Sequence, residues 1–203
     1  MPPKTPLLRP KAYFERARDP FFGGLVVFVL YVIGTIIGIG AMASLVVGQI
    51  DDPPAGLRSA MTELLLLTAI IYVVIAVVAL LIVAAIMHLF TAGPDSEGSF
   101  GDAVGVAGWA YAPEIASLPL LYLYARWRVG QLSIDGSDPE LAVQQMETLQ
   151  DPSGVGLLVT FGVVAWSVYI LAKGTSGTHD VDIGNALLPA LLIGVGSFLL
   201  SLL

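Results

Sequence analysis

Residues 64–87 read LLLLTAIIYVVIAVVALLIVAAIM, a run without a single charged side chain. A helix that crosses the hydrocarbon core of a bilayer, about 30 Å thick, needs about 20 mainly apolar residues, because each residue rises about 1.5 Å. A membrane strand would instead alternate apolar and polar positions, and this run is apolar on every side. The run therefore predicts a transmembrane helix, which we place at residues 63–90.

Four further apolar segments have nearly the same length. They lie at residues 21–47, 102–124, 155–172 and 186–203. The segment at 102–124 differs from the others because Pro113, Glu114 and Pro119 interrupt it. The sequence thus predicts an all-α, polytopic membrane protein: a bundle of five transmembrane helices at residues 21–203, preceded by a short N-terminal arm at residues 1–20.

Composition supports a membrane protein and excludes several other classes. Hydrophobic residues make up 56% of the chain and the mean hydropathy is +0.85, which is too apolar for a surface that faces only water. A net charge of −7 argues against nucleic-acid binding, which needs a basic surface. No cysteine is present, so disulfides and thiolate chemistry are excluded. Scarce lysine and abundant acidic residues are typical of halophilic, archaeal proteins.

The distribution of basic residues predicts the orientation in the membrane. With five spans, one side receives six basic residues, namely Lys4, Arg9, Lys11, Arg16, Arg18 and Lys173. The opposite side receives three, namely Arg58, Arg126 and Arg128. Since basic loops stay in the cytoplasm, we expect a multi-pass protein of the cell membrane with a cytoplasmic N-terminus and an external C-terminus.

The longest predicted connection is at residues 126–154. Within it, Asp138, Pro139 and Glu140 are typical of a helix start, and residues 139–149 predict a short helix. Its apolar positions, Leu141, Met146 and Leu149, favour packing on the membrane bundle; docking of a partner is the alternative.

Glu114 is the first candidate functional residue. A carboxylate in an apolar segment costs several kcal/mol unless it is protonated, paired or exposed to water. Pro113 and Pro119 each remove a backbone donor and are expected to bend the helix, which frees carbonyl groups. Bent helices with an ionisable group can bind ions or protons. A purely structural hydrogen bond across the bundle is the alternative, and it is the interpretation that we favour.

Glycine pairs are candidates for close helix packing. Gly34 and Gly38 form a GxxxG pattern, and Gly105 and Gly108 lie near the start of the predicted third span. Small residues let helices approach closely in lipid. Because GxxxG is a weak motif, we favour packing inside the chain over self-association. Neither pair is part of a nucleotide-binding loop, since no Gly-Lys-Ser/Thr follows.

No arrangement of residues predicts catalysis. His88 and His179 lie far apart in the sequence and no HExxH motif occurs, so we expect no metal site. No Ser-His-Asp arrangement with a nucleophile elbow occurs either. Tyr111 belongs to a group of aromatic residues near the ends of the third span, where an interfacial belt is expected. We predict neither catalytic residues nor a cofactor.

Several short motifs resemble the Yip1 family of membrane proteins. They are the segment GSFGDAVGVAGWAYAP at residues 98–113, WSVY at 166–169, Asn185-Ala186, Arg9-Pro10 and Asp19-Pro20-Phe21. The resemblance implies five helices and a cytoplasmic N-terminus. Eukaryotic relatives bind Rab-type GTPases and one another and shape membranes. This chain has only a short arm and lacks the acidic-Leu-Tyr-Gly-Pro segment of those relatives, which argues against GTPase binding.

Two functions are therefore expected. The first is that of a nonenzymatic Yip1-like protein that lies in the lipid bilayer, acts by self-association or by binding another membrane protein, and takes part in membrane organisation or a trafficking-like process. The second is that of a small transporter or channel component that uses the carboxylate of Glu114.

Overall fold

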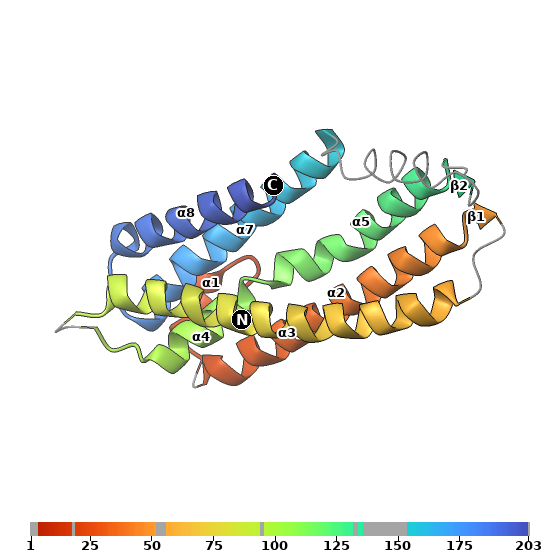
Figure 1. Cartoon of the computed structure of the whole chain (residues 1–203). Helices are drawn as coiled ribbons and strands as arrows, with labels where there is room; N and C mark the ends of the chain where they lie inside the picture. The colour runs from red at the N-terminus through yellow and green to blue at the C-terminus, as the bar shows by residue number, and fades with distance from the viewer. Residues whose placement is uncertain are drawn as a thin grey trace.

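The computed structural model describes residues 4–17, 19–51, 56–93, 96–131, 134–135 and 154–202. Long helices dominate these parts of the chain (Figure 1). In order, the elements are α1 (Pro10–Phe14), α2 (Pro20–Val47), β1 (Ile50–Asp51), α3 (Leu57–Thr91), α4 (Phe100–Trp109), α5 (Ala112–Val129), β2 (Ile134–Asp135), α7 (Gly154–Thr178) and α8 (Ile183–Leu200). The predicted all-α class is confirmed, apart from the two-residue strands β1 and β2.

Four of the predicted spans correspond to single long helices. The helices α2, α3, α7 and α8 are each long and apolar enough to cross a membrane. The helix α3 starts six residues earlier than predicted, and α7 continues six residues beyond the predicted end at residue 172. Lys173 therefore lies in the last turns of α7 and not in the loop where the orientation argument placed it.

The predicted third span, at residues 102–124, is divided into α4 and α5. The break falls at Ala110 and Tyr111, directly before Pro113 in the first turn of α5. Proline is well tolerated in a first turn, where its missing N–H would have no partner, so Pro113 starts a new helix. Pro119 lies inside α5, as expected for a bending residue. Among the described helices, four and not five satisfy the criteria for a span by themselves.

The divided segment runs alongside α2 in the same direction (Figure 1). Gly105 in α4 lies against Pro20 at the start of α2, and Gly34 in the middle of α2 lies against Leu118 of α5. Beyond the helix ends, Ile50 of β1 pairs with Ile134 of β2 in parallel. Together α4 and α5 thus extend from one end of the bundle to the other.

The tightest packing lies where α4 contacts α2, α3 and α7. All residues from Ala103 to Gly108 are buried. Glycine makes this possible, because a Cβ at Gly24 would overlap the backbone of Gly105 and a Cβ at Gly108 would overlap that of Gly24. The serine Ser99 caps α4 together with Asp102 in a capping box, which satisfies donors at its first turn.

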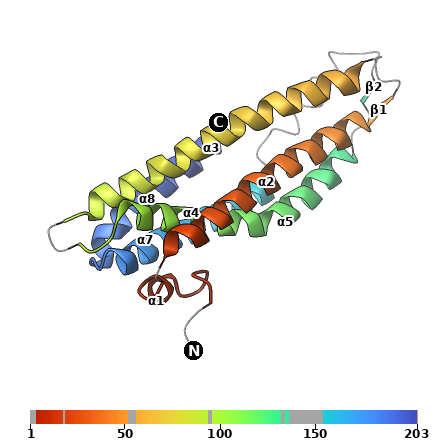
Figure 2. The same ribbon diagram turned by 90° about the horizontal axis from the view of Figure 1, so that it is seen from below.

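The N-terminal arm is folded onto the end of α7. Indole Nε1 of Trp166 donates to the carbonyl of Leu7 at 2.9 Å, and the hydroxyl of Tyr169 donates to the carbonyl of Leu8 at 3.0 Å. In α1, Phe14 is buried against Gly174 of α7. Figure 2 shows α1 beneath the end of the bundle where α7 finishes.

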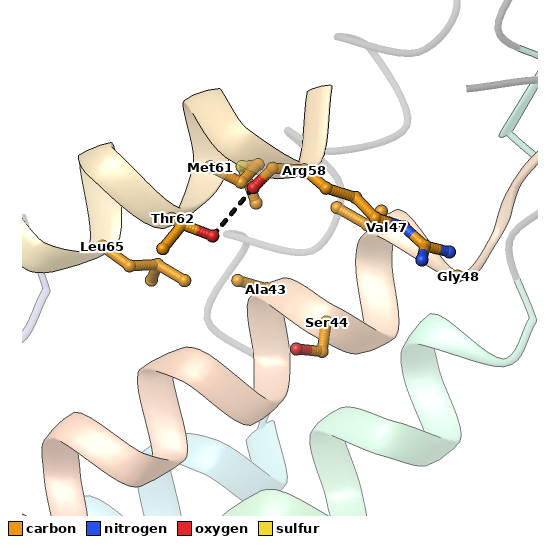
Figure 3. Close-up of a pocket in the computed structure, with 8 residues that line it drawn as sticks. All are labelled: Ala43, Ser44, Val47, Gly48, Arg58, Met61, Thr62 and Leu65. Carbon is orange, nitrogen blue, oxygen red and sulfur yellow. Dashed lines mark hydrogen bonds between the residues drawn. The ribbon is translucent and has the colours of Figure 1, made fainter. Parts of the chain in front are cut away.

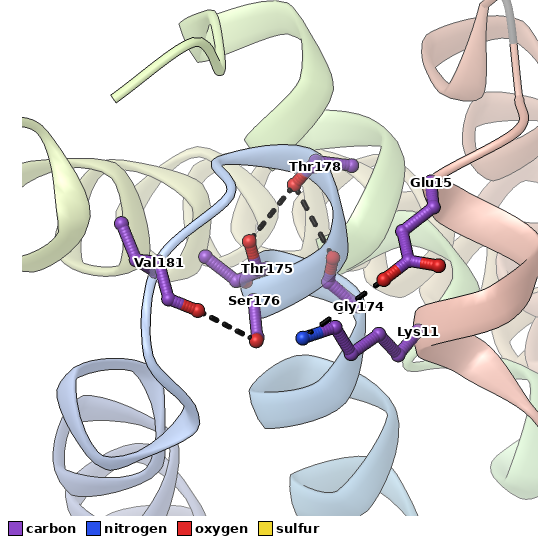
Figure 4. A network of polar contacts seen from close by, with 7 residues as sticks. All are labelled: Lys11, Glu15, Gly174, Thr175, Ser176, Thr178 and Val181. Atoms are coloured by element: carbon purple, nitrogen blue, oxygen red, sulfur yellow. Dashed lines mark hydrogen bonds and ion pairs between the residues drawn. The ribbon is translucent and has the colours of Figure 1, made fainter. Parts of the chain in front are cut away.

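Hydroxyl groups terminate α7 beside this arm (Figure 4). Thr178 Oγ1 lies 3.3 Å from the carbonyl oxygen of Gly174 and 3.2 Å from that of Thr175, and Ser176 Oγ donates to the carbonyl of Val181 at 2.8 Å. The carbonyl of Thr175 also accepts from the amide N–H of His179, so the last turn of α7 has several hydrogen bonds, and the bond from Ser176 to Val181 connects this turn to the segment before α8. These bonds hold the sharp turn between α7 and α8.

The remaining surface of the long helices is strongly apolar. Large exposed hydrophobic side chains line α3 on several sides, as lipid contact requires, and examples are Leu66, Leu67, Val73, Ile75 and Ile82. The predicted helix at residues 139–149 lies outside the described residues.

Candidate functional site

Glu114 lies in the first turn of α5, one residue after Pro113. A helix N-terminus is a favourable place for a carboxylate, because its free N–H groups carry partial positive charge. The hydroxyl of Ser117 donates to the backbone carbonyl of Glu114 at 2.8 Å. Division of the third span thus places the carboxylate at a helix start in the interior of the bundle.

Tyrosines from other helices surround this carboxylate. The hydroxyl of Tyr31 in α2 interacts with Glu114, and Tyr72 in α3 lies beside Tyr31, with a buried hydroxyl that forms no hydrogen bond within the described residues. The ring of Tyr111 stacks on that of Tyr31 with centroids 4.7 Å apart, and Phe28 packs edge-on against Tyr111 at 5.4 Å. Tyr111 is therefore part of an interior aromatic cluster and not of an interfacial belt.

A cavity of about 280 Å³ opens beside the carboxylate, between α2, α5, α7 and α8. Apolar surface forms most of its lining, and hydroxyl-bearing residues contribute the polar part, namely Tyr31, Thr35, Ser117, Thr160, Ser197 and Ser201. The hydroxyl of Thr35 is buried and has no hydrogen-bond partner among the described residues. Because water occupies about 30 Å³ in the liquid, the cavity has room for several molecules that could satisfy this group. We call the carboxylate, the tyrosines and this cavity the Glu114 site.

The side chains of the Glu114 site are suited to binding. A carboxylate with hydroxyl oxygens nearby can hold a proton or a cation, because these oxygens have lone pairs to offer, while valine and leucine side chains form the rest of the lining. Acid–base hydrolysis of the glycosidase type needs two carboxyl groups, and the lining contains one. In the described part of the chain, no group of three or more histidine and acidic side chains is placed to hold a metal ion.

His88 and His179 lie in contact at the end of the bundle, although no sequence pattern predicts that they pair. Nδ1 of His88 lies 3.1 Å from Nε2 of His179, and Nδ1 of His179 lies 2.9 Å from Oγ1 of Thr178. Since the hydroxyl hydrogen of Thr178 points to backbone carbonyls, a consistent chain has His179 donating to Thr178 and accepting from His88. His179 is fully buried, and a Cβ at Gly98 would overlap its ring.

This arrangement favours a neutral His179. Burial lowers the pKa of His179, and the nearby His88 imidazole lowers it further, while Asp102 has a smaller effect in the opposite direction. The pair connects the end of α3 to the turn between α7 and α8. Protonation of His179 in acid would therefore weaken this contact between the two elements.

The candidate glycines fall into two groups. Gly105 and Gly108 pack inside the chain against α2, and Gly34 packs against Leu118. By contrast, a Cβ at Gly38 would meet no atom of the chain within 4 Å. Of the two glycines in the GxxxG pattern, Gly34 is therefore packed inside the molecule, and Gly38 faces open space.

Four helices that are each long and apolar enough to cross a membrane, together with the apolar outer surface of these helices, indicate a multi-pass membrane protein. Comparison with known families gives a match to the Yip1 domain over residues 4–203. The chain therefore belongs to the Yip1 family, as the short motifs indicated. No curated protein and no solved structure gave a match.

Proposed function

We propose that this chain is a nonenzymatic membrane protein that acts by associating, within the bilayer, with a second copy of itself. One observation carries the proposal: the open position beside Gly38 in the second half of α2. In lipid, where apolar surface alone does not drive association, helices pair at small residues that let their backbones approach. The other three candidate glycines are already covered by contacts inside the chain.

The variant Gly38→Leu tests this proposal. We expect cross-linking of the protein in liposomes to give a dimer for the wild type, and we expect the dimer to be lost when leucine blocks the close approach. Gly196→Leu in α8 is the matched control, because a Cβ at Gly196 is also open to its surroundings. Gly34→Leu is unsuitable, since even its Cβ would lie 2.8 Å from Cδ1 of Leu118 and disturb the fold. A wild-type monomer, or a dimer unaffected by Gly38→Leu, would refute self-association.

The proposal includes a topology of five crossings, in which α4 and α5 together form the crossing between α3 and α7. The N-terminus is then in the cytoplasm and the C-terminus outside the cell membrane. The parallel course of α4–α5 along α2 supports five crossings. Because the chain has no cysteine, single cysteines at Glu97 and Gln131, both exposed, can be labelled with a membrane-impermeant maleimide. We expect labelling from outside intact cells at position 131 and not at position 97. Labelling of both positions from the same side would exclude a crossing formed by α4 and α5.

Proton or cation transport is a second candidate, and the Glu114 site favours it. The site combines an interior carboxylate with a cavity of about 280 Å³ and the unpartnered hydroxyl of Thr35. We expect flux into liposomes for the wild type, loss of flux in Glu114→Gln, and normal flux in Glu97→Gln, which changes an exposed carboxylate elsewhere. Equal flux in wild type and Glu114→Gln would exclude Glu114 as the carrier. Absence of flux in correctly inserted wild-type protein would leave Glu114 with a structural role.

A further inference from the structure

A groove separates the end of α2 from the start of α3. Its outer part is a cavity of about 380 Å³ between Ala43, Ser44 and Gly48 on α2 and Arg58 on α3 (Figure 3). Its inner part is a slot of about 180 Å³ that extends along Gly40 to Ile36. Thr62 and Leu65 line both parts, so the two form one continuous groove.

The groove is a consequence of the way α3 packs. Away from this end, α3 packs more extensively against α4 and α8 than against α2. On the α2 side the groove presents small residues, and a Cβ at Gly40 would meet no atom of the chain within 4 Å. The helices therefore diverge without side chains that fill the space between them. An unfilled apolar slot forfeits contacts, which a bound apolar group would restore.

The polar end of the groove fits an anion. The hydroxyl of Ser44 donates to the carbonyl of Gly40 at 2.9 Å, and that of Thr62 donates to the carbonyl of Arg58 at 2.8 Å, so both hydroxyl hydrogens are already used. The guanidinium of Arg58, whose side chain extends towards Val47 and Gly48, is the charged donor that remains (Figure 3). Within the described ranges Arg58 forms no ion pair, and the groove has no carboxylate in its lining.

Length and polarity together match one lipid. From Gly48 to Ile36 the groove follows twelve residues of α2, which is about 18 Å of helix and close to the depth of one leaflet, about 15 Å. Its charged end lies at the helix termini, where headgroups are found, and its apolar end lies towards the middle of the helices. We propose that this groove binds one phospholipid, with the phosphate on Arg58 and an acyl chain in the slot beside Gly40.

Arginine suits this role because its planar guanidinium donates two parallel hydrogen bonds to a phosphate. The site is independent of the proposed self-association. Gly38 and Gly40 are two residues apart, so they point about 200° apart around α2. Each position can therefore be blocked without blocking the other.

Native mass spectrometry tests the proposal on the full chain, released in mild detergent from dioleoyl phosphatidylglycerol vesicles. We expect the wild type to retain one lipid per chain. Arg58→Gln removes the charge and Gly40→Leu fills the slot, and each is expected to lower the retained fraction about tenfold. Gly38→Leu is the matched control and retains the lipid, whether or not it affects dimer formation. Inorganic phosphate at millimolar concentration should not displace the lipid, because phosphate does not occupy the slot.

A measurement on the wild type keeps the test independent of whether the variants fold. Phosphatidylglycerol with a photoreactive acyl chain is expected to label residues 36–48 and 57–69 at least fivefold more than α8. Uniform labelling of all lipid-facing helices, a wild type without retained lipid, or equal retention in all variants would overturn the proposal. Displacement of the lipid by free phosphate would show a simple anion site. Lipid-free dimers cross-linked through the groove would show that a second chain occupies it.

Discussion

The variant Gly105→Ala adds one methyl group where α2 and α4 cross. At Gly105 the new Cβ would lie 2.5 Å from the carbonyl carbon of Pro20 and 2.7 Å from the amide nitrogen of Phe21. Favourable contacts between such atoms are about 3.5–4.0 Å long. Both partners are backbone atoms, so no side-chain rotation can relieve the overlap. The two helices must separate by about 1 Å.

The cost of this separation can be estimated. Overpacking of a well-packed core costs about 1–3 kcal/mol, and the better helix propensity of alanine offsets about 0.5–1 kcal/mol. We expect a net loss of about 1–2 kcal/mol in the free energy of unfolding. For a chain of this size each kcal/mol corresponds to about 2–4 °C, so the melting temperature should fall by about 2–8 °C.

Thermal unfolding in detergent, followed by tryptophan fluorescence, measures this change. Trp109 is a suitable reporter, because its Nε1 atom lies 3.1 Å from the position of a Cβ at Gly23 in the same contact. Gly196→Ala in α8 is the matched control: it adds the same methyl group where no described atom lies within 4 Å, and it should leave the melting temperature unchanged or raised. If Gly105→Ala melts at the same temperature as Gly196→Ala, the reasoning about the crossing is wrong.

Two further predictions concern the end of the bundle. The fold lowers the pKa of His179 from its usual 6.5, so below about pH 6.5 the unfolded chain binds more protons than the folded chain. The free energy of unfolding should therefore fall with acid, by at most about 1.4 kcal/mol per pH unit. The variant His179→Asn should show a smaller slope of melting temperature against pH. The variant Trp166→Phe removes the donor to Leu7, worth about 1 kcal/mol, so trypsin should cleave after Lys11 about fivefold faster. Exposed Trp127→Phe is the control, and equal cleavage of the two variants would show that the arm is held by other contacts.

The spans that consist of one uninterrupted helix were predicted well, because an apolar run is a local feature of the sequence. An apolar run of about 20 residues has few alternatives to a membrane helix, and α2 and α3 lie close to the positions predicted from their runs. The division of residues 102–124 was not predicted. Pro113 is compatible both with a bend in one helix and with the first turn of a new one, and only the packing of Gly105 and Gly108 against α2 selects the second.

The candidate site was predicted in part. Glu114 was recognisable because a carboxylate is rare in an apolar segment, but Tyr31, Thr35 and Tyr72 come from other helices, and no local pattern connects them to it. A signal was present in Tyr72, which is the one tyrosine in the uncharged run of residues 64–87. The contact between His88 and His179 depends on how α3 and α7 end, and it could not be inferred from a separation of 91 positions.

The folded arm has a consequence for the order in which the protein is made. Leu7 is synthesised 159 positions before its partner Trp166. At a synthesis rate of about 5–20 residues per second, the arm waits about 8–32 seconds before α7 exists. During that interval the earlier helices can enter the membrane while the arm is unattached. The arm is therefore fixed late in the assembly of the bundle, although it is synthesised before the long helices.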